Sequence, residues 1–409
     1  MKSPIQSLPP GLPGRLLHHG AVAGLALLLV AGLGGCGGGS SSSLAANQMR
    51  MTVEENPLLN AIEPGQAKRD EAYVSVVVCD SSDHCVTVPY VQVDTGSTGL
   101  RLRYQTVAGL DLQPMVPASG AQLDECAPFV TGYVWGPVEQ ASVQLGDEPR
   151  IELPIQVYGS GNPGVPVTPL CASLGNDSGS LRALGANGIL GIQGLVHAPA
   201  GSFFCTGSSC TYKPSPPSAD LVVNPVSELN DSDNNGVILT LPPVPASGAR
   251  MAQGTLTFGI DTRDDNQTTA FVPIATDAYF NMIVSSQGVN LPASTIDSGA
   301  NGILGKFNIP YDPSTMDFDP AVPQALLLTM SNEVGTLPAV SMSTSIEIAN
   351  SDLLGAGSNY ALDDYGGYDQ SSTQALIGLP YFFGRSIAYV MSGKSTALGT
   401  GPLIGVLNP

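Results

Sequence analysis

Two short segments of the chain each place an Asp directly before a hydroxyl side chain and a Gly. Residues 93–97 read Val-Asp-Thr-Gly-Ser, and residues 296–300 read Ile-Asp-Ser-Gly-Ala. When two carboxylates meet, repulsion raises the pKa of one of them, so the pair holds a single proton. Such a pair activates water without a metal or a covalent nucleophile. Asp94 and Asp297 are therefore the candidate catalytic pair, provided that the fold brings them together.

Strand patterns precede both Asp residues. Residues 73–78 and 86–93 alternate around a turn, which predicts a hairpin whose second strand runs into Asp94. Four strands are predicted in the second half, and the last of them runs into Asp297: 254–260, 270–274, 279–284 and 294–296. Each half then reaches an apolar segment that ends in Gly, at 187–191 and 375–378. The same order of features, met twice, predicts a duplicated fold.

The composition indicates a mainly β protein. The chain contains 48 Gly and 34 Pro, which separate many short runs rich in Val, Ile, Thr and Tyr. Helical turns are expected at residues 180–184 and 380–383. The formal net charge of −19 argues against nucleic acid as a partner.

The first residues predict export. Lys2 and Arg15 give a basic start, and residues 21–33 form an apolar run that is too short to span a bilayer. This combination is typical of a signal peptide.

A lipid anchor is predicted at Cys36. Residues 33–36 read Leu-Gly-Gly-Cys, which resembles a bacterial lipobox, in which the Cys becomes the lipidated first residue. We therefore expect a lipoprotein signal peptide over 1–36, a Gly/Ser tether over 37–47, and attachment to the bacterial outer membrane. The alternative is an ordinary signal peptide with an incidental Cys.

The six cysteines that follow predict disulfides, because their number is even in an exported chain. Two pairs are local and the third follows by elimination: Cys79–Cys85, Cys205–Cys210 and Cys126–Cys171. No metal site is predicted, because the cysteine spacings do not suit zinc and the exported part keeps only His84 and His197. The same scarcity argues against a His-dependent nucleophile.

Residues 231–236 match the first half of a calcium-binding loop, but Pro242 stands where its Glu belongs. We interpret this segment as a polar turn. No cofactor is expected.

The order of motifs resembles that of pepsin-like aspartic proteases over most of the exported chain. The resemblance is carried by residues 73–102, 188–191, 254–261, 271–300 and 376–390. It implies a bilobal β-barrel fold with lobes over 48–262 and 263–409, and an active site between them. The chain also resembles a bacterial lipoprotein family of unassigned function.

The resemblance also assigns roles to the residues beside each Asp. Thr95 and Ser298 keep the hydroxyls that lock the two loops together in this family, and Gly96, Ser97 and Gly299 complete the loops. Ala300 lacks the hydroxyl that Ser97 offers to the first Asp. Fewer donors stabilise the ionised carboxylate less, so we expect a less acidic optimum than in enzymes with a hydroxyl at both places.

Three positions depart from the family pattern. Arg101 stands where Trp is usual, and Leu379 stands where Asp is common. The hairpin that covers the substrate carries Phe129 at the place of its usual Tyr, with Tyr133 and Trp135 nearby. These three aromatic residues are the predicted covering group.

The predicted function is hydrolysis of peptide bonds in a peptide or protein substrate by a lipid-anchored, monomeric aspartic endopeptidase. The alternative is a catalytically inactive protein that binds a peptide or another ligand in the same cleft, since an Asp-hydroxyl-Gly turn can be purely structural. Glycoside hydrolysis by two carboxylates is a weaker third possibility, because one Trp is few for stacking sugars.

Overall fold

The computed structural model describes residues 44–408, except 118–119, 131, 160–165, 200, 333–340 and 372. The predicted signal peptide, Cys36 and most of the tether therefore lie outside the described residues. Asn47, which the sequence placed at the end of the tether, is buried and donates from Nδ2 to the carbonyl of Phe258 at 2.9 Å. In the part of the chain that is described, no helix is long and apolar enough to cross a membrane.

The fold is mainly β, as predicted. Among the described residues, the larger sheet contains 17 strands. They are β1 (Gln48–Glu54), β2 (Ala72–Cys79), β3 (Cys85–Asp94), β4 (Thr98–Arg103), β5 (Gln113–Pro114), β6 (Gln122–Phe129), β7 (Gly132–Leu145), β8 (Ile151–Tyr158), β9 (Asn176–Asp177), β10 (Gly188–Ile192), β11 (Ser202–Thr206), β12 (Ser209–Lys213), β13 (Gly236–Thr240), β14 (Met251–Phe258), β15 (Val272–Ala275), β23 (Ser386–Val390) and β26 (Leu403–Leu407).

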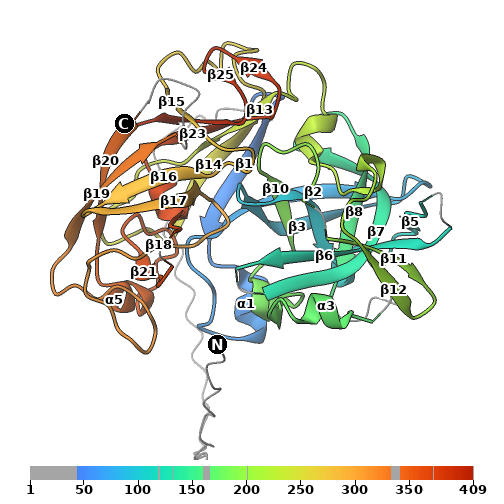
Figure 1. The fold of residues 1–409 in the computed structure, drawn as a ribbon, viewed down its shortest axis with the longest axis horizontal. Coiled ribbons are helices and arrows are strands. Elements are labelled where there is room, and N and C mark those ends of the chain that lie inside the picture. Colours follow the sequence, from blue (N-terminus) through green and yellow to red (C-terminus); the bar gives the residue numbers. More distant parts are fainter. Residues whose placement is uncertain are drawn as a thin grey trace, which may run out of the picture. The chain divides into compact units, whose positions relative to one another are not determined.

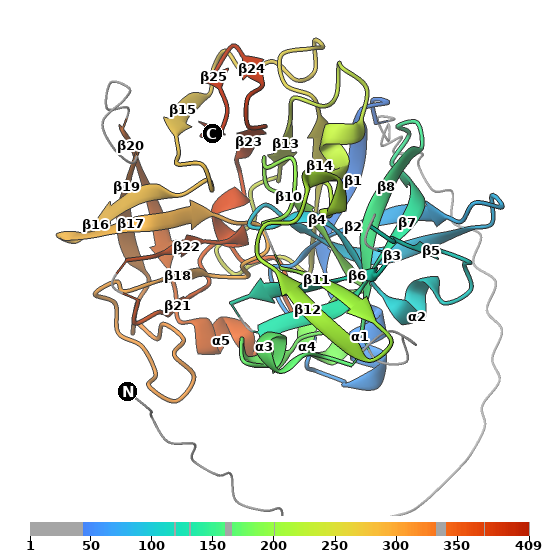
Figure 2. The ribbon, with the colours of Figure 1, turned by 45° about the vertical axis from the view of Figure 1, so that its right-hand side comes forward.

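A second sheet has seven described strands in the order β20-β19-β16-β17-β22-β18-β21. They are β16 (Met282–Ser286), β17 (Val289–Ile296), β18 (Ile303–Gly305), β19 (Gln324–Ser331), β20 (Ser341–Ile348), β21 (Gly366–Tyr368) and β22 (Leu376–Ile377). A small hairpin joins β24 (Ser395–Thr396) to β25 (Gly399–Thr400). In Figure 1 and Figure 2 the orange strands of the seven-stranded sheet and the cyan to green strands β2–β12 form separate groups.

The described helices are short. They are α1 (Pro57–Ile62), α2 (Tyr104–Val107), α3 (Pro169–Ala172), α4 (Leu181–Leu184) and α5 (Ser351–Gly355), with 3-10 turns η1 (Ser218–Asp220), η2 (Pro225–Glu228) and η3 (Leu379–Phe382). The prediction of a helix at 180–184 is confirmed: Ser180 caps α4 by accepting the N–H of Ala183 at 3.1 Å. The predicted helical turn at 380–383 is the 3-10 turn η3.

The same three-strand arrangement occurs once in each sheet. In the larger sheet, β10 runs parallel to β3 and antiparallel to β4. In the seven-stranded sheet, β22 runs parallel to β17 and antiparallel to β18. Since β3 ends at Asp94 and β17 ends just before Asp297, the repeat gives both residues the same local setting.

A shared hydrophobic core holds the two arrangements in place. It contains fully buried side chains from both sheets, among them Val93, Leu190, Ile296, Ile377 and Tyr389. The periodicity of two is clear in β20, where buried and exposed residues alternate along the whole strand. The strands that end at the two Asp residues therefore rest on one packed interior.

All three predicted disulfides are confirmed. Cys79 and Cys85 face each other across the β2–β3 hairpin, and Cys205 and Cys210 do so across the β11–β12 hairpin. Cys126–Cys171 joins β6 to α3 over a sequence separation of 45 residues.

Candidate active site

Asp94 lies at the end of β3 and is held by the turn that follows it. Its Oδ1 accepts the N–H of Gly96 at 2.7 Å, and its Oδ2 accepts the hydroxyl of Ser97. Only 5% of the residue is exposed. β10 passes directly behind this turn, with Gly191 in register with Asp94. A side chain at Gly191 would press on Ser97 Oγ and the N–H of Thr98, each 2.8 Å from the position of a Cβ.

Asp297 occupies the equivalent place after β17. Its N–H donates to the carbonyl of Ile377 on β22 at 3.0 Å, and its Oδ1 accepts the N–H of Gly299 at 2.8 Å. Ala300 stands where the first loop has Ser97, so no hydroxyl is offered from that position. The ionised form of Asp297 therefore receives less hydrogen-bond stabilisation from its own loop.

Thr95 and Ser298 lock the two loops to each other. The N–H of Thr95 donates to Ser298 Oγ at 3.1 Å, and the N–H of Ser298 donates to Thr95 Oγ1 at 2.9 Å. Ser298 Oγ then donates to the carbonyl of Val93 at 2.7 Å. Both side chains are fully buried, so water does not compete for these bonds.

Two glycines let the carboxylates approach. A Cβ at Gly299 would lie 2.5 Å from Asp94 Oδ1 and 3.2 Å from Asp297 Oδ1, so both carboxylates face one small space beside this residue. Gly96 lies in the same way against the carboxylate of Asp297. Because glycine has no side chain, Gly96 can lie against Asp297 and Gly299 can lie against Asp94.

Burial raises the pKa of Asp297 well above its ordinary value, and the nearby charge of Asp94 raises it further. The N–H of Gly299 acts in the opposite direction but is the weaker influence. The arrangement therefore favours Asp297 as the holder of a proton that the two carboxylates share.

Both Asp residues line a cleft of about 490 Å³. Apolar side chains from both sheets and from α4 also line it, namely Phe129, Ile189, Leu304, Leu376 and, on α4, Leu184. The tip of the β6–β7 hairpin contributes Phe129 and Val130, and Val130 is 79% exposed. Apolar walls with a few convergent polar groups are typical of clefts that bind a ligand.

Tyr133 and Trp135 are not brought to the cleft. They pack in a buried cluster with the Cys126–Cys171 disulfide, and the ring of Trp135 meets that of Phe203 at 5.1 Å between centroids. Trp135 lies opposite Cys126 in the hairpin register, which explains its orientation. Of the three predicted covering residues, Phe129 alone lies among the cleft-lining residues that the structure describes.

Arg101, a position at which the sequence differs from the pepsin-like pattern that it resembles, forms a buried ion pair. Its Nη2 lies 2.9 Å from Glu125 Oε1, and its Nε donates to Glu125 Oε2 at 3.2 Å. Its Nη1 donates to the carbonyl of Thr98 at 2.7 Å. Arg101 thus ties β4, which follows the Asp94 loop, to β6 of the β6–β7 hairpin.

The sequence reasoning missed Gln92 and Tyr389. Gln92 lies two residues before Asp94, lines the cleft, and donates from Nε2 to the carbonyl of Gly299 at 3.2 Å. A polar side chain between Val91 and Val93, close to Asp94, was a usable signal for it. Tyr389 lies in the apolar strand β23, where nothing in the pattern marks its hydroxyl.

The polar segment at 231–236 is a turn before β13, as interpreted. Its Asp233 is buried and pairs with Arg263, with Oδ2 at 2.6 Å from Nη2. Among the described residues, no group of three or more His, Cys, Asp or Glu side chains is arranged to hold a metal ion.

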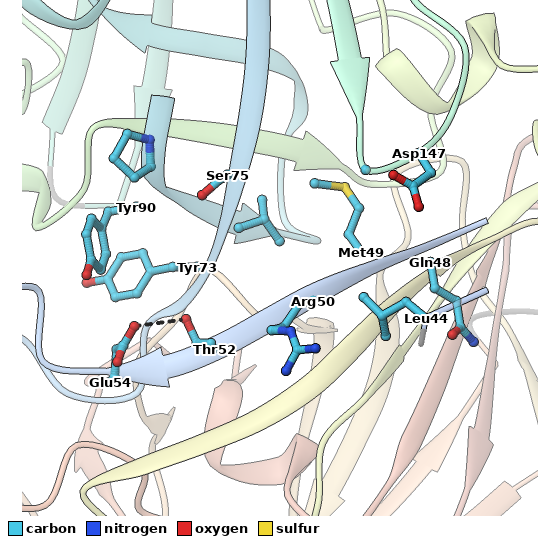
Figure 3. A pocket seen from close by; sticks show the side chains of 13 residues that line it. Leu44, Gln48, Met49, Arg50, Thr52, Glu54, Tyr73, Ser75, Tyr90 and Asp147 are labelled. Carbon is cyan, nitrogen blue, oxygen red and sulfur yellow. Dashed lines mark hydrogen bonds between the residues drawn. The ribbon is translucent and has the colours of Figure 1, made fainter. Parts of the chain in front are cut away.

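A second groove, of about 420 Å³, lies along β1 (Figure 3). Arg50, Thr52 and Glu54 line it together with Tyr73 and Tyr90, whose rings meet edge to face at 5.5 Å. Glu54 accepts the hydroxyl of Thr52 at 3.2 Å (Figure 3). Asp94 and Asp297 do not line this groove, so the paired carboxylates belong to the cleft.

Comparison with known proteins gives a family for the chain. A search of curated proteins found no match. A family model with the description "Protein of unknown function (DUF3443)" matches residues 43–405, which is most of the chain. The chain is therefore a member of the DUF3443 family of proteins of unknown function.

Proposed function

We propose that this protein is an aspartic endopeptidase with a pepsin-like bilobal fold. The main support is the geometry of the two Asp loops. Hydrogen bonds between Thr95 and Ser298 join these loops, and both carboxylates face one small space in a cleft. The matched arrangements β3–β10–β4 and β17–β22–β18 support a duplicated fold with lobes over 48–262 and 263–409.

The reaction begins with a water molecule between Asp94 and Asp297. Asp94 takes a proton from this water as its oxygen adds to the carbonyl carbon of the peptide bond. Asp297 gives its proton to the carbonyl oxygen, so that a neutral tetrahedral diol forms. No covalent intermediate with the protein is required.

In the second half of the reaction the diol breaks down and the two carboxyl groups return to their starting protonation states. One diol hydroxyl loses its proton to the now ionised Asp297 as the C–N bond breaks, and Asp94 delivers its proton to the leaving nitrogen. The products are a carboxylic acid and an amine. The pair ends with one proton on Asp297, as it began, so the cycle is balanced.

The assignment of the proton to Asp297 follows from its surroundings. Burial and the charge of Asp94 raise its pKa, whereas Asp94 accepts both an N–H and a hydroxyl from its own loop. Hydrogen bonds to an ionised carboxylate favour that form. Asp94 is therefore the proposed base and Asp297 the proposed acid.

The substrate class is a peptide or protein segment in extended form. Apolar side chains on both walls of the cleft can bury apolar substrate residues, and the β6–β7 hairpin can cover them with Phe129 and Val130. Phe129 has no hydroxyl, so this hairpin holds the substrate by apolar contact. We also propose that the protein works in the bacterial cell envelope as a monomer, anchored through a lipid on Cys36.

The test is cleavage of a mixed peptide library by the exported protein from acidic to neutral pH, read by mass spectrometry. The wild type should cleave, and the Asp94→Asn and Asp297→Asn variants should not. Asp147→Asn is the matched control, because Asp147 is an exposed residue of the β1 groove. Equal cleavage by the wild type and all three variants would contradict the proposal. Peptide binding without cleavage by the wild type would favour the binding-protein alternative.

A further inference from the structure

The two hydroxyls that join the catalytic loops do not reach equivalent partners. Ser298 Oγ donates to the carbonyl of Val93 at 2.7 Å, whereas Thr95 Oγ1 lies 3.5 Å from the carbonyl of Ile296. These two carbonyls belong to the residues directly before Asp94 and Asp297. A separation of 3.5 Å is at the limit for a hydroxyl donor, so the hydrogen bond from Thr95 to the carbonyl of Ile296 is weak by itself.

The hydroxyl of Tyr389 on β23 bridges Thr95 and the carbonyl of Ile296. It accepts the hydroxyl of Thr95 at 3.1 Å and donates to the carbonyl of Ile296 at 2.8 Å. The side chain of Tyr389 is fully buried, and burial raises the pKa of its hydroxyl well above the ordinary value. The group therefore remains a neutral donor throughout the pH range in which the carboxylates titrate.

A second contact holds the same loop from its other end. Gln92 donates to the carbonyl of Gly299, two residues after Asp297. The Asp297 loop is thus tied before and after its carboxylate by side chains from outside the seven-stranded sheet. Tyr389 supplies the tie that is directly joined to the lock between Thr95 and Ser298.

We propose that Tyr389 is a positioning residue for the aspartic pair, whose hydroxyl completes the lock on the Asp297 side and so fixes the separation of the two carboxylates. The consequence for catalysis rests on the proposed function, but the lock does not. Without the hydroxyl, Thr95 Oγ1 has to move toward Ile296 O to keep a partner. The Asp297 loop then loosens and the two carboxylates can separate.

The experiment compares the wild type with Tyr389→Phe and Tyr158→Phe. Both substitutions remove one hydroxyl and keep the ring. Tyr158 is a matched control because it is fully buried and its hydroxyl has no hydrogen-bond partner among the described residues. The measurements are carboxyl carbon NMR titration of ¹³C-labelled Asp residues and hydrogen exchange at the N–H of Ser298.

In Tyr389→Phe, the higher pKa of the aspartic pair should fall, because separated carboxylates repel less, but it should stay above the ordinary range, because burial is the larger cause of the shift. Exchange at Ser298 should accelerate about tenfold, the effect of losing one net hydrogen bond. Tyr158→Phe should match the wild type in both measurements. Wild-type titration and exchange in Tyr389→Phe would overturn the inference. Failure of Tyr389→Phe alone to fold would also contradict it, because the hydroxyl would then serve overall stability.

Cleavage assays separate this inference from the proposed function. If the wild type cleaves a peptide, Tyr389→Phe should lower kcat about tenfold or more with KM unchanged, since the carboxylates rather than the cleft walls are displaced. If the wild type cleaves nothing, the protease proposal fails. The NMR titration and the exchange rates still decide whether Tyr389 positions the pair.

Discussion

Arg101 and Glu125 form a buried bidentate ion pair that connects β4, the strand after the Asp94 loop, to the β6–β7 hairpin. The two contacts measure 2.9 and 3.2 Å, and each side chain is about 5% exposed or less. The N–H of Gln156 Nε2 also donates to the backbone carbonyl of Glu125 at 2.7 Å. The position of the hairpin over the cleft therefore depends on a charged contact inside the protein.

Glu125→Gln should destabilise the protein strongly, because it leaves the charge of Arg101 buried without its partner. The expected loss is about 3 kcal/mol in the free energy of unfolding, measured with a chemical denaturant. The double variant Arg101→Met, Glu125→Met should recover most of this loss, since it buries no charge. A loss below about 1 kcal/mol in Glu125→Gln would show that the pair does not hold the hairpin.

Gly299→Ala should abolish most activity while the fold is kept. The added Cβ would meet Asp94 Oδ1 at 2.5 Å and has to push the two carboxylates apart. A displacement of about 1 Å at such a site costs on the order of 100-fold in kcat/KM. Gly109→Ala is the control, because a Cβ there meets nothing within 4 Å. Full activity in Gly299→Ala would mean that the close approach is not needed.

Ala300→Ser should shift the pH dependence of cleavage. A hydroxyl at this place, as at Ser97, would donate to the ionised form of Asp297 and lower its raised pKa. In the proposed mechanism Asp297 holds the proton, so activity should be lost as the pH rises through that pKa, and the alkaline limb of the pH–rate profile should move to lower pH. An unmoved or upward-shifted limb would contradict the assignment of Asp297 as the acid.

Several strands and two of the disulfides were predictable because their signals are local, and the third disulfide, Cys126–Cys171, followed by elimination. Alternation over a few residues gave the strand that leads to Asp94, whereas only residues 294–296 of β17 were predicted before Asp297. The short spacing of Cys79–Cys85 and Cys205–Cys210 suggested local pairs. Residues 254–260 and 279–284 were likewise close to β14 and β16.

The contacts that set the site were not predictable, because they join residues that are far apart in the sequence. Arg101 pairs with Glu125 at a separation of 24 residues, and Tyr389 bonds to Ile296 at a separation of 93. The direction of Trp135 depends on which residue of β6 lies opposite it, and that register places it beside Cys126. The alternation of a strand gives two faces without saying which one meets the cleft.

Asp297 should also make the stability of the protein depend on pH. Its pKa is raised in the folded state, so the folded protein binds this proton more tightly than the unfolded chain does. The resulting stabilisation is present below the unfolded pKa and is lost as the pH rises through the folded pKa. Asp297→Asn should remove this part of the pH dependence of the free energy of unfolding. An unchanged pH dependence would place the carboxylate in a more polar setting than the structure gives it.

The most direct measurement is kcat/KM for peptide cleavage by Asp94→Asn, Asp297→Asn and the double variant. If the two carboxylates activate one water together, each single substitution should cost about 1,000-fold or more, and the double variant should be no worse than the singles. Losses that multiply in the double variant, or a single variant that retains wild-type activity, would contradict a shared water and with it the proposed aspartic pair.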